Sequence, residues 1–440
     1  MPKDLQTAAS PAGPAAYSRI RHARGGPHQN GMNAPPGAHC GKEQILLQLG
    51  RLPGRVTVLA AAIAVTAATG SWFALSHARA SGTATAAAGQ ASSGSGSGQA
   101  TQAAAIPLQV VSVTPARHTQ HVNGAAPVTI QFSAALAPDS PTPHITPGIP
   151  GNWTRPTPTQ LVFTPMAGFR PHTRVTVRIP GGSGGVKAAS GGLLAHQLTT
   201  RFRTGTWSLV RLDQLLAELD YLPLTWAPDA SETSPDAADA AAQRFAAFDP
   251  PAGKFTWNRG YPRELRTFWK AGSADSLIIK GAVMAFENDH GMTMDGVAGP
   301  AVWRALFRAE AKGQANKAGY TYARATKYSP ETLTIWHNGH QVFHALANTG
   351  IPAAPTESGT APVYLRYRFQ IMRGTNPDGS KYADPVQYVA YFRAGEAVHY
   401  FPRGSYGFPQ SLGCVELPLG DAAKAWPFLT YGSLVTVTNP

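Results

Sequence analysis

Two residues near the end of the chain could together carry out nucleophilic chemistry. Cys414 lies in the stretch FPQSLGCVEL, and His399 precedes it by fifteen residues. A thiol attacks well only as a thiolate, so a histidine in the same domain predicts covalent catalysis with the imidazole as base. Gly413 would let the backbone approach a substrate closely, and the amides beside it could hold an oxyanion. The alternative is a buried structural thiol, because free cysteine is often a small core residue.

Composition narrows the class of protein in which such a pair would act. The chain has 440 residues with 45 glycines, 38 prolines and 14% charged residues, which favours several β-rich domains joined by flexible segments. The formal net charge of +13 suits an anionic cell envelope, whereas the spread of basic residues along the chain argues against a nucleic-acid partner. Because Cys40 is the only other cysteine, a disulfide framework is excluded.

The first part of the chain predicts a membrane anchor. Residues 1–55 show no apolar period and are predicted to be a disordered cytoplasmic tail. Residues 56–75, VTVLAAAIAVTAATGSWFAL, carry no charge over the length that a helix needs to span a bilayer. Because Arg51 and Arg55 precede this segment, the positive-inside rule predicts a single-pass protein of the cell membrane with an extracytoplasmic C-terminus. The cytoplasmic membrane would then be a partner through this helix.

Two alternatives stand beside the anchor. The segment 56–75 could be a buried helix of a soluble domain, or a signal peptide cleaved near Ala78-Arg79-Ala80, which would make the protein secreted. With an anchor or a signal peptide, everything after residue 80 is exported, and Cys40 does not meet Cys414. Residues 76–105, rich in Gly, Ser and Ala, are predicted to be a flexible linker.

Short alternating strands, separated by Pro and Gly clusters, fill residues 106–206 and predict a β-sandwich. The phrases VSVTPA, VTIQFSAAL and TTRFRTG resemble the bacterial Ig-like domains of envelope proteins. The resemblance implies a spacer without catalytic residues.

Residues 207–312 change to a helical period. The stretch DGVAGPAVW at 295–303 resembles the end of the peptidoglycan-binding-like three-helix module, with a tight turn at Asp295-Gly296 and Pro300 opening a helix. The resemblance implies wall binding or the positioning of a neighbouring domain. The apolar face of the first helix is formed by Leu209, Leu212, Leu215, Leu216 and Leu219.

Residues 318–440 return to strands. Asn338-Gly339 between alternating runs at 332–336 and 341–346 predicts a hairpin with a type I′ turn. The histidines around this turn share no helix face and have no cysteine or carboxylate nearby, so we predict no metal site. They are His337, His340 and His344.

The order of elements in residues 318–440 closely resembles the L,D-transpeptidase catalytic domain, the YkuD-type fold. The family's cysteine lies in S-H-G-C-x-R/N, about fifteen residues after a histidine that ends a strand. The corresponding residues here are 411–416 and His399. A short helix and a G-T-x-V-x-V strand end the family's domain, and DAAKAW at 421–426 and YGSLVTV at 431–437 occupy those places.

This resemblance implies residue roles. Cys414 would be the nucleophile and His399 the base, while Ser411 and Gly413 would support the loop and the oxyanion. No cofactor and no metal are implied. Three tyrosines are candidates for lining the substrate groove: Tyr388, Tyr400 and Tyr406.

The resemblance also implies an activity. A cysteine-dependent acyltransferase would form a thioester with peptidoglycan stem peptides and make 3→3 cross-links. Two residues depart from the family motif: Leu412 replaces its second histidine, and Glu416 replaces its Arg or Asn. A carboxylate near the thiol opposes thiolate formation unless Arg403 or another cation offsets it. The alternative function is therefore a catalytically weak or inactive wall-binding scaffold.

A papain-like thiol peptidase is disfavoured, because His399 precedes the cysteine in the chain. The predicted fold class is multidomain and mainly β: one N-terminal transmembrane helix, an Ig-like sandwich, a small three-helix module and a C-terminal β-rich catalytic domain.

Overall fold

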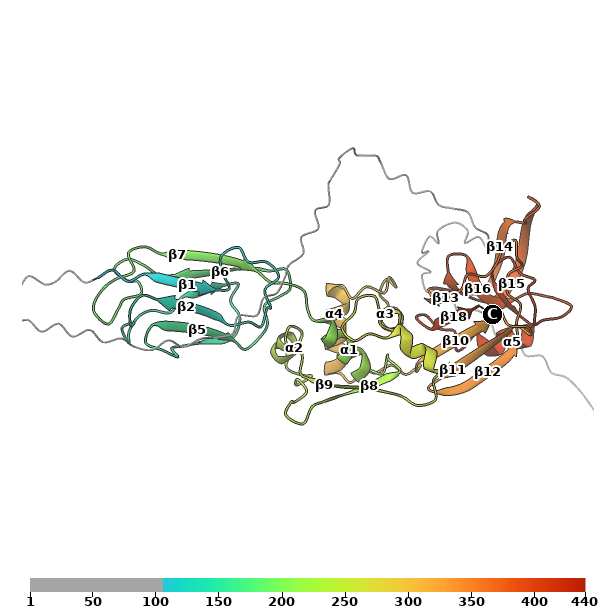
Figure 1. Ribbon diagram of the computed structural model, residues 1–440, viewed down its shortest axis with the longest axis horizontal. Helices are drawn as coiled ribbons and strands as arrows, with labels where there is room; N and C mark the ends of the chain where they lie inside the picture. The colour runs from blue at the N-terminus through green and yellow to red at the C-terminus, as the bar shows by residue number, and fades with distance from the viewer. Residues whose placement is uncertain (1–105, 440) are drawn as a thin grey trace, which may run out of the picture. The chain divides into compact units, whose positions relative to one another are not determined.

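The structure is a computed structural model that describes residues 106–439 (Figure 1). The predicted tail over 1–55, helix over 56–75 and linker over 76–105 lie outside the described residues. No helix of the described part is long and apolar enough to cross a bilayer. The longest, α3, has 13 residues, whereas a span needs about 20.

This finding corrects two predictions. The mainly β, multidomain part of the fold class is found, but its transmembrane helix was wrong. The predicted single-pass location in the cell membrane was wrong with it, and the membrane as a partner through this helix is not supported.

The first described region is a β-sandwich. One sheet has the strand order β1-β2-β5-β4 and the other β3-β6-β7, and every pairing is antiparallel. Alternation along β2 and β6 turns Ile130, Phe132, Val175 and Val177 into the core between the sheets. The strands are β1 Val110–Thr114, β2 Val128–Phe132, β3 His144–Thr146, β4 Gly151–Thr154, β5 Gln160–Pro165, β6 Arg174–Ile179 and β7 Leu198–Arg203.

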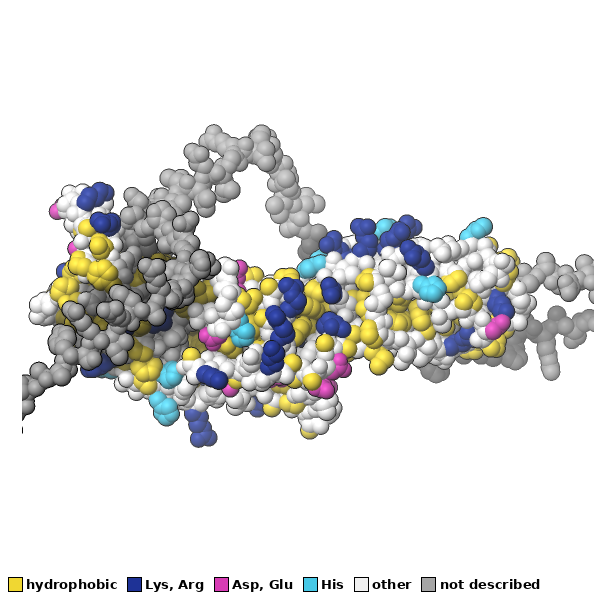
Figure 2. Space-filling view, turned by 180° about the vertical axis from the view of Figure 1, so that it is seen from behind, with side chains coloured by type: hydrophobic (Ala, Val, Ile, Leu, Met, Phe, Trp, Pro, Cys, Tyr) yellow, Lys and Arg dark blue, Asp and Glu magenta, His cyan; other side chains and the backbone are white. Residues whose placement is uncertain are grey.

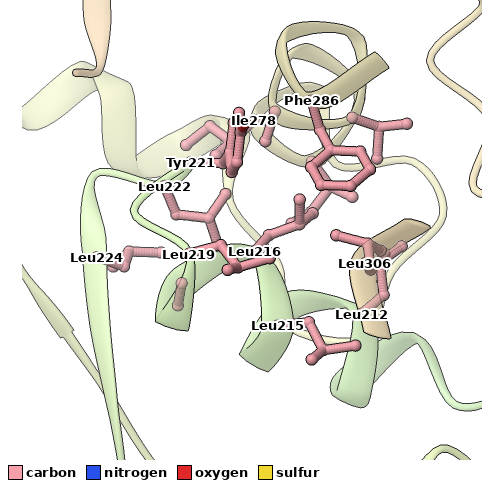
Figure 3. Close-up of a cluster of buried hydrophobic side chains, with 14 of the residues drawn as sticks. Leu212, Leu215, Leu216, Leu219, Tyr221, Leu222, Leu224, Ile278, Phe286 and Leu306 are labelled. Atoms are coloured by element: carbon pink, nitrogen blue, oxygen red, sulfur yellow. The ribbon is translucent and has the colours of Figure 1, made fainter. Parts of the chain in front are cut away.

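A helical region follows. The predicted leucine face belongs to α1 and packs against α3 and α4, where Phe286 and Leu306 are fully buried (Figure 3). As expected, Pro300 is the first residue of α4, a position where its missing N–H costs nothing. The helices are α1 Leu209–Glu218, α2 Ala240–Ala246, α3 Leu277–Asp289 and α4 Pro300–Ala311, with a 3₁₀ helix at Arg263–Phe268.

The helical region also contains a two-stranded sheet that the sequence did not reveal. Its strands are β8, Leu224–Pro228, and β9, Gly253–Trp257, which pair in antiparallel orientation. In the sequence, α2 lies between them. The likeness of this region to a peptidoglycan-binding module stays a prediction.

The C-terminal region contains two sheets around a common core. The five-stranded sheet has the order β12-β11-β10-β18-β13, and the four-stranded sheet the order β14-β15-β16-β17. Ala323, Ile335 and Val435 of the first sheet share this core with Val398 and Val415 of the second. The elements are β10 Thr321–Thr326, β11 Thr332–His337, β12 His340–Leu346, β13 Gly359–Pro362, β14 Leu365–Thr375, β15 Lys381–Arg393, β16 Glu396–Tyr400, β17 Val415–Leu417, α5 Leu419–Ala425 and β18 Leu434–Thr438.

Two contacts hold this region to the helices before it. Tyr322 and Leu434 belong to the same apolar core as the leucine face of α1. Glu264 accepts a hydrogen bond from Tyr322 Oη at 2.8 Å and pairs with Arg324 at 3.0 Å.

The hairpin between β11 and β12 turns as predicted. Asn338 and Gly339 both have positive φ, 48° and 80°, which a type I′ turn requires.

On the face seen in Figure 2, Lys and Arg side chains form several separate groups rather than one continuous patch.

Candidate active site

The parallel pair β16 and β17 positions the cysteine and the histidine. His399 lies opposite Glu416 in the register, and Val398 lies opposite Val415. Side chains alternate along a strand, and Val398 and Val415 enter the core between the sheets. His399, Glu416 and Cys414, directly before β17, therefore point to the other face of the four-stranded sheet.

Cys414 is almost completely buried, with 1% of its surface exposed. Its Sγ donates a weak hydrogen bond to the carbonyl oxygen of Gly395 at 3.8 Å. The thiol is thus oriented by backbone at the start of β16, the strand that carries His399.

His399 is also buried, with 3% exposed. Its Nδ1 lies 2.9 Å from the carbonyl oxygen of Tyr400, which can only accept, so Nδ1 carries the proton. In the neutral ring, Nε2 is then a free acceptor and a potential base. Burial, more than any nearby charge, lowers the pKa of His399 and favours this neutral form.

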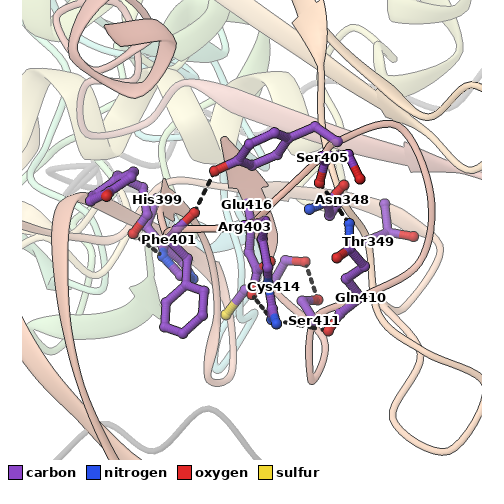
Figure 4. Close-up of polar contacts among 12 residues, drawn as sticks. Asn348, Thr349, His399, Phe401, Arg403, Ser405, Gln410, Ser411, Cys414 and Glu416 are labelled. Carbon is purple, nitrogen blue, oxygen red and sulfur yellow. Dashed lines mark hydrogen bonds and ion pairs between the residues drawn. The ribbon is translucent and has the colours of Figure 1, made fainter. Parts of the chain in front are cut away.

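Cys414 and His399 line the same cavity, which has a volume of about 200 Å³. In Figure 4, Cys414 and Arg403 lie between His399 and Phe401 on one side and Ser411 and Gln410 on the other. The cavity is lined by Met372, Asn376, Tyr382, Asp384, Val386, His399, Phe401, Arg403, Gln410, Leu412, Cys414 and Glu416.

A β-bulge in β15 brings part of this lining into place. The pairing of β15 with β16 gains one residue between Gln387 and Ala390, and Tyr388 within it has φ 58°. A bulge reverses which residues face which side. As a result Asp384 before it lines the cavity, whereas Ala390 and Phe392 after it enter the core.

A second cavity, of about 180 Å³, shares Leu412 with the first. Gly395, Glu396 and Gly413 are among its lining residues. Glu396 is 8% exposed, and burial raises the pKa of its carboxyl from 4.5 to about 7.

Ser411 and Gly413 form part of the loop before the cysteine. Ser411 Oγ donates to the carbonyl oxygen of Cys414 at 2.6 Å and accepts from the Gly413 amide at 3.1 Å. Ser411 therefore braces the loop. The Gly413 amide would have to leave Ser411 before it could bind an oxyanion. Gly413 has φ 115°, a conformation that favours glycine.

The three tyrosines predicted for the groove lie outside the lining of the cavity around Cys414. Tyr388 and Tyr400 pack against the core between the sheets. Tyr406 donates from its hydroxyl to the carbonyl oxygen of Phe401 at 2.6 Å, which closes the loop after β16.

The structure pairs Glu416 with Arg403. Nε and Nη2 of Arg403 each donate to one oxygen of Glu416 at 2.8 Å, and Nη2 also donates to the carbonyl oxygen of Gln410 at 3.0 Å. Arg403 is therefore the cation that we expected to offset the charge of this carboxylate near the thiol.

Sequence reasoning missed Asp384, Tyr382 and Phe401. Phe401 lies two residues after His399 and could have been found from alternation, whereas the bulge hides Asp384 and Tyr382. Within residues 106–439, no group of three or more His, Cys, Asp or Glu side chains is arranged to hold a metal ion.

Solved structures of three L,D-transpeptidases resemble the chain. L,D-transpeptidase LdtMt1 in complex with imipenem is 17% identical, with 76% of this chain and 100% of that chain covered and a TM-score of 0.26. An L,D-transpeptidase from Mycobacterium smegmatis is 15% identical, with the same coverage and TM-score. The Enterococcus faecium catalytic domain acylated by ertapenem is 23% identical, with 27% and 98% covered and a TM-score of 0.25.

Among curated proteins, none matches the chain significantly. Two family profiles do match parts of it. The bacterial Ig-like domain family matches residues 104–204, and the L,D-transpeptidase catalytic domain family, YkuD, matches residues 326–437, which include His399 and Cys414. The chain therefore carries a bacterial Ig-like domain followed by an L,D-transpeptidase catalytic domain of the YkuD family.

Proposed function

We propose that the protein is an active L,D-transpeptidase that makes 3→3 cross-links between peptidoglycan stem peptides. Cys414 is the nucleophile and His399 the general base. The reaction is an acyl transfer in two steps through a thioester, and it needs no cofactor.

In the first step, His399 Nε2 takes the proton of the Cys414 thiol, and the sulfur attacks the carbonyl carbon after the third stem residue. A C–S bond forms, and the carbonyl electron pair moves to the oxygen, where backbone amides of the 412–414 loop stabilise it. When the intermediate collapses, the C–N bond breaks. The terminal D-amino acid leaves with the proton held by His399.

In the second step, the side-chain amine of another stem attacks the thioester carbon. His399 accepts a proton from this amine, a new C–N bond forms, and the C–S bond breaks. The proton then returns to the Cys414 sulfur, which restores the enzyme. The two cavities that share Leu412 offer separate spaces for the two peptides.

One observation supports this proposal most directly. Cys414 and His399 come from adjacent parallel strands and line one cavity, within the residues that match the catalytic family. The Nδ1–H bond of His399 to a backbone carbonyl supports it further, because it leaves Nε2 as an acceptor.

Intact-protein mass spectrometry with ertapenem tests the nucleophile. Opening of the lactam ring adds the whole drug, so the unmodified chain should gain one ertapenem mass. Cys414→Ala should gain none, and Cys40→Ala is the matched control that should be acylated like the unmodified chain. With a tetrapeptide stem as donor and a second stem as acceptor, the expected product is a 3→3 linked dimer.

The alternative is a wall-binding scaffold with little or no catalysis. The replacements at Leu412 and Glu416 favour it, as does the engagement of the Gly413 amide with Ser411. This alternative would replace our proposal if the unmodified chain gave neither the adduct nor the dimer but sedimented with purified peptidoglycan.

A further inference from the structure

Arg403 and Glu416 form an ion pair in the cavity around Cys414, where the carboxylate is almost completely buried. Glu416 is only 4% exposed, yet it carries a carboxylate into the cavity that contains the cysteine. Arg403 meets it with two parallel hydrogen bonds of 2.8 Å, the strongest geometry for such a pair (Figure 4). A third bond from Arg403 to the backbone of Gln410, and the Phe401 ring 4.6 Å from its guanidinium carbon, fix the side chain.

Glu416 lies directly beside the histidine. The two residues are opposite each other in the parallel register of β16 and β17, so their side chains leave the sheet on the same face. Arg403 reaches them from the loop after β16. The other titratable groups facing His399 in the cavity are Cys414, Asp384 of β15 and Tyr382 of β15.

An unpaired carboxylate at this position would work against catalysis. Its negative charge would favour the protonated form of His399, which cannot accept a proton from the thiol, and it would disfavour the thiolate of Cys414. Both effects are strong in a buried site, because little solvent screens them. A guanidinium that cancels the carboxylate removes both.

We propose that Arg403 is a positioning residue that neutralises Glu416 and thereby keeps His399 unprotonated and able to act as the base. Glu416 in turn holds the guanidinium in the cavity wall. The catalytic consequence rests on the proposed function, whereas the effect on the protonation of His399 does not.

The direction of each electrostatic contribution agrees with this assignment. Glu416 raises the pKa of His399 and Arg403 lowers it, both more weakly than burial, which lowers it. Asp384 also raises the pKa of His399 and remains present in every variant below, so it does not affect the comparison.

A double-mutant cycle in the full-length chain tests the inference. We would compare the unmodified protein with Arg403→Gln, Glu416→Gln and the double variant, and titrate His399 by NMR of ¹³C-labelled histidine. The His399 signal is assigned by its loss in His399→Gln. Arg393→Gln is the matched control, because Arg393, the last residue of β15, pairs at 3.8 Å with Glu396, the first residue of β16, and neither lines the cavity around Cys414.

We expect Arg403→Gln to raise the pKa of His399 by about one unit, since one nearby charge shifts a pKa by one unit or more. The acid limb of the ertapenem acylation rate should move up by the same amount, so acylation below that limb falls about tenfold. The double variant should return to the value of the unmodified protein, and Arg393→Gln should not differ from it. A merely structural role for Arg403 would not produce this recovery.

An unchanged His399 titration in Arg403→Gln, or no recovery in the double variant, would overturn the inference. If Arg403→Gln does not fold, Arg403→Lys tests the inference, because lysine keeps the positive charge but cannot make the two parallel hydrogen bonds to Glu416. His399 should then titrate as in the unmodified protein, and a raised pKa would contradict us. If the titrations behave as expected but ertapenem leaves no adduct, the proposed function fails and the electrostatic role of Arg403 stands.

Discussion

The Ig-like sandwich and the catalytic domain bury polar groups in different ways. In the described part of the sandwich, the buried polar side chains are Thr200 and Thr204. In the catalytic domain, the buried titratable side chains include Glu331, Glu396, His399 and Glu416. Burying an ionisable group costs far more than burying a hydroxyl. The sandwich is thus organised for packing alone, whereas the catalytic domain carries costly groups.

The buried titratable side chains of the catalytic domain lie at or next to the cavity around Cys414. His399 and Glu416 line the cavity with Cys414, and Glu396 lines the neighbouring one. Glu331 accepts from the amide and hydroxyl of Thr349 at 2.6 and 2.7 Å. The carbonyl oxygen of Thr349 in turn accepts from the amide of Ser411, so even Glu331 acts on the cysteine loop. Within the catalytic domain, the buried carboxylates and the buried histidine therefore gather around the cysteine loop.

The largest expected effect is on catalysis and comes from His399→Gln. General base catalysis contributes about 10² to 10⁴-fold, so ertapenem acylation should slow by about that factor. The melting temperature should fall only slightly, because the substitution removes one hydrogen bond, from Nδ1 to the carbonyl oxygen of Tyr400. Stopped-flow fluorescence and calorimetry would measure the two quantities. An acylation rate within threefold of the unmodified protein would reject His399 as the base.

A substitution in the core of the sandwich should have the opposite pattern, a loss of stability without a loss of acylation. Phe132 is 2% exposed in its core, and Phe132→Ala should lower the free energy of unfolding of this domain by about 3–5 kcal/mol. Acylation at 25 °C should stay unchanged, because no catalytic group lies there. Chemical denaturation followed by circular dichroism, with the ertapenem assay alongside, checks both parts. A parallel loss of acylation would mean that the sandwich contributes to the active region after all.

A smaller effect concerns Glu396 and pH. Burial raises the pKa of this carboxyl in the folded chain from 4.5 to about 7, so the folded state keeps a proton that the unfolded state releases. Its contribution to stability is full below about pH 4.5 and is lost as the pH rises through 7. Glu396→Gln removes this dependence, and its oxygen can still accept from the Glu357 amide.

Relative to the unmodified chain, Glu396→Gln should therefore gain about 1–2 kcal/mol of stability between pH 5 and pH 8, after allowance for solvent screening. Urea denaturation at the two pH values measures this gain. Parallel stability curves for the two proteins would show that Glu396 titrates normally.

The smallest effect is expected at the surface of the sandwich. Lys187 and Asp139 form an ion pair of 2.6 Å, but both side chains are exposed, 38% and 70%. Solvent and salt screen such pairs. Lys187→Ala should therefore leave the melting temperature unchanged within error. A clear loss of stability would contradict the expectation that solvent screens this pair.

The sequence alone was enough for the local features. Alternation and turn residues predicted a β-sandwich but not its strands β3 and β4, the leucine spacing predicted α1, and Asn338-Gly339 predicted the turn of its hairpin. These features depend on neighbours along the chain, where periodicity and backbone sterics act directly. The membrane helix was also predicted from a local pattern and was wrong: no helix of the described residues is long and apolar enough to cross a bilayer.

The candidate site shows the limit of this reasoning. Residue type made Cys414 and His399 candidates, the family resemblance assigned their roles, and the need for a cation beside Glu416 followed from charge alone. That Arg403 meets this carboxylate with a bidentate fork depends on how the loop after β16 folds back. That Asp384 faces the cavity depends on a bulge. Such contacts join residues far apart in the chain through strand register, and register is decided only when the sheet packs on its core.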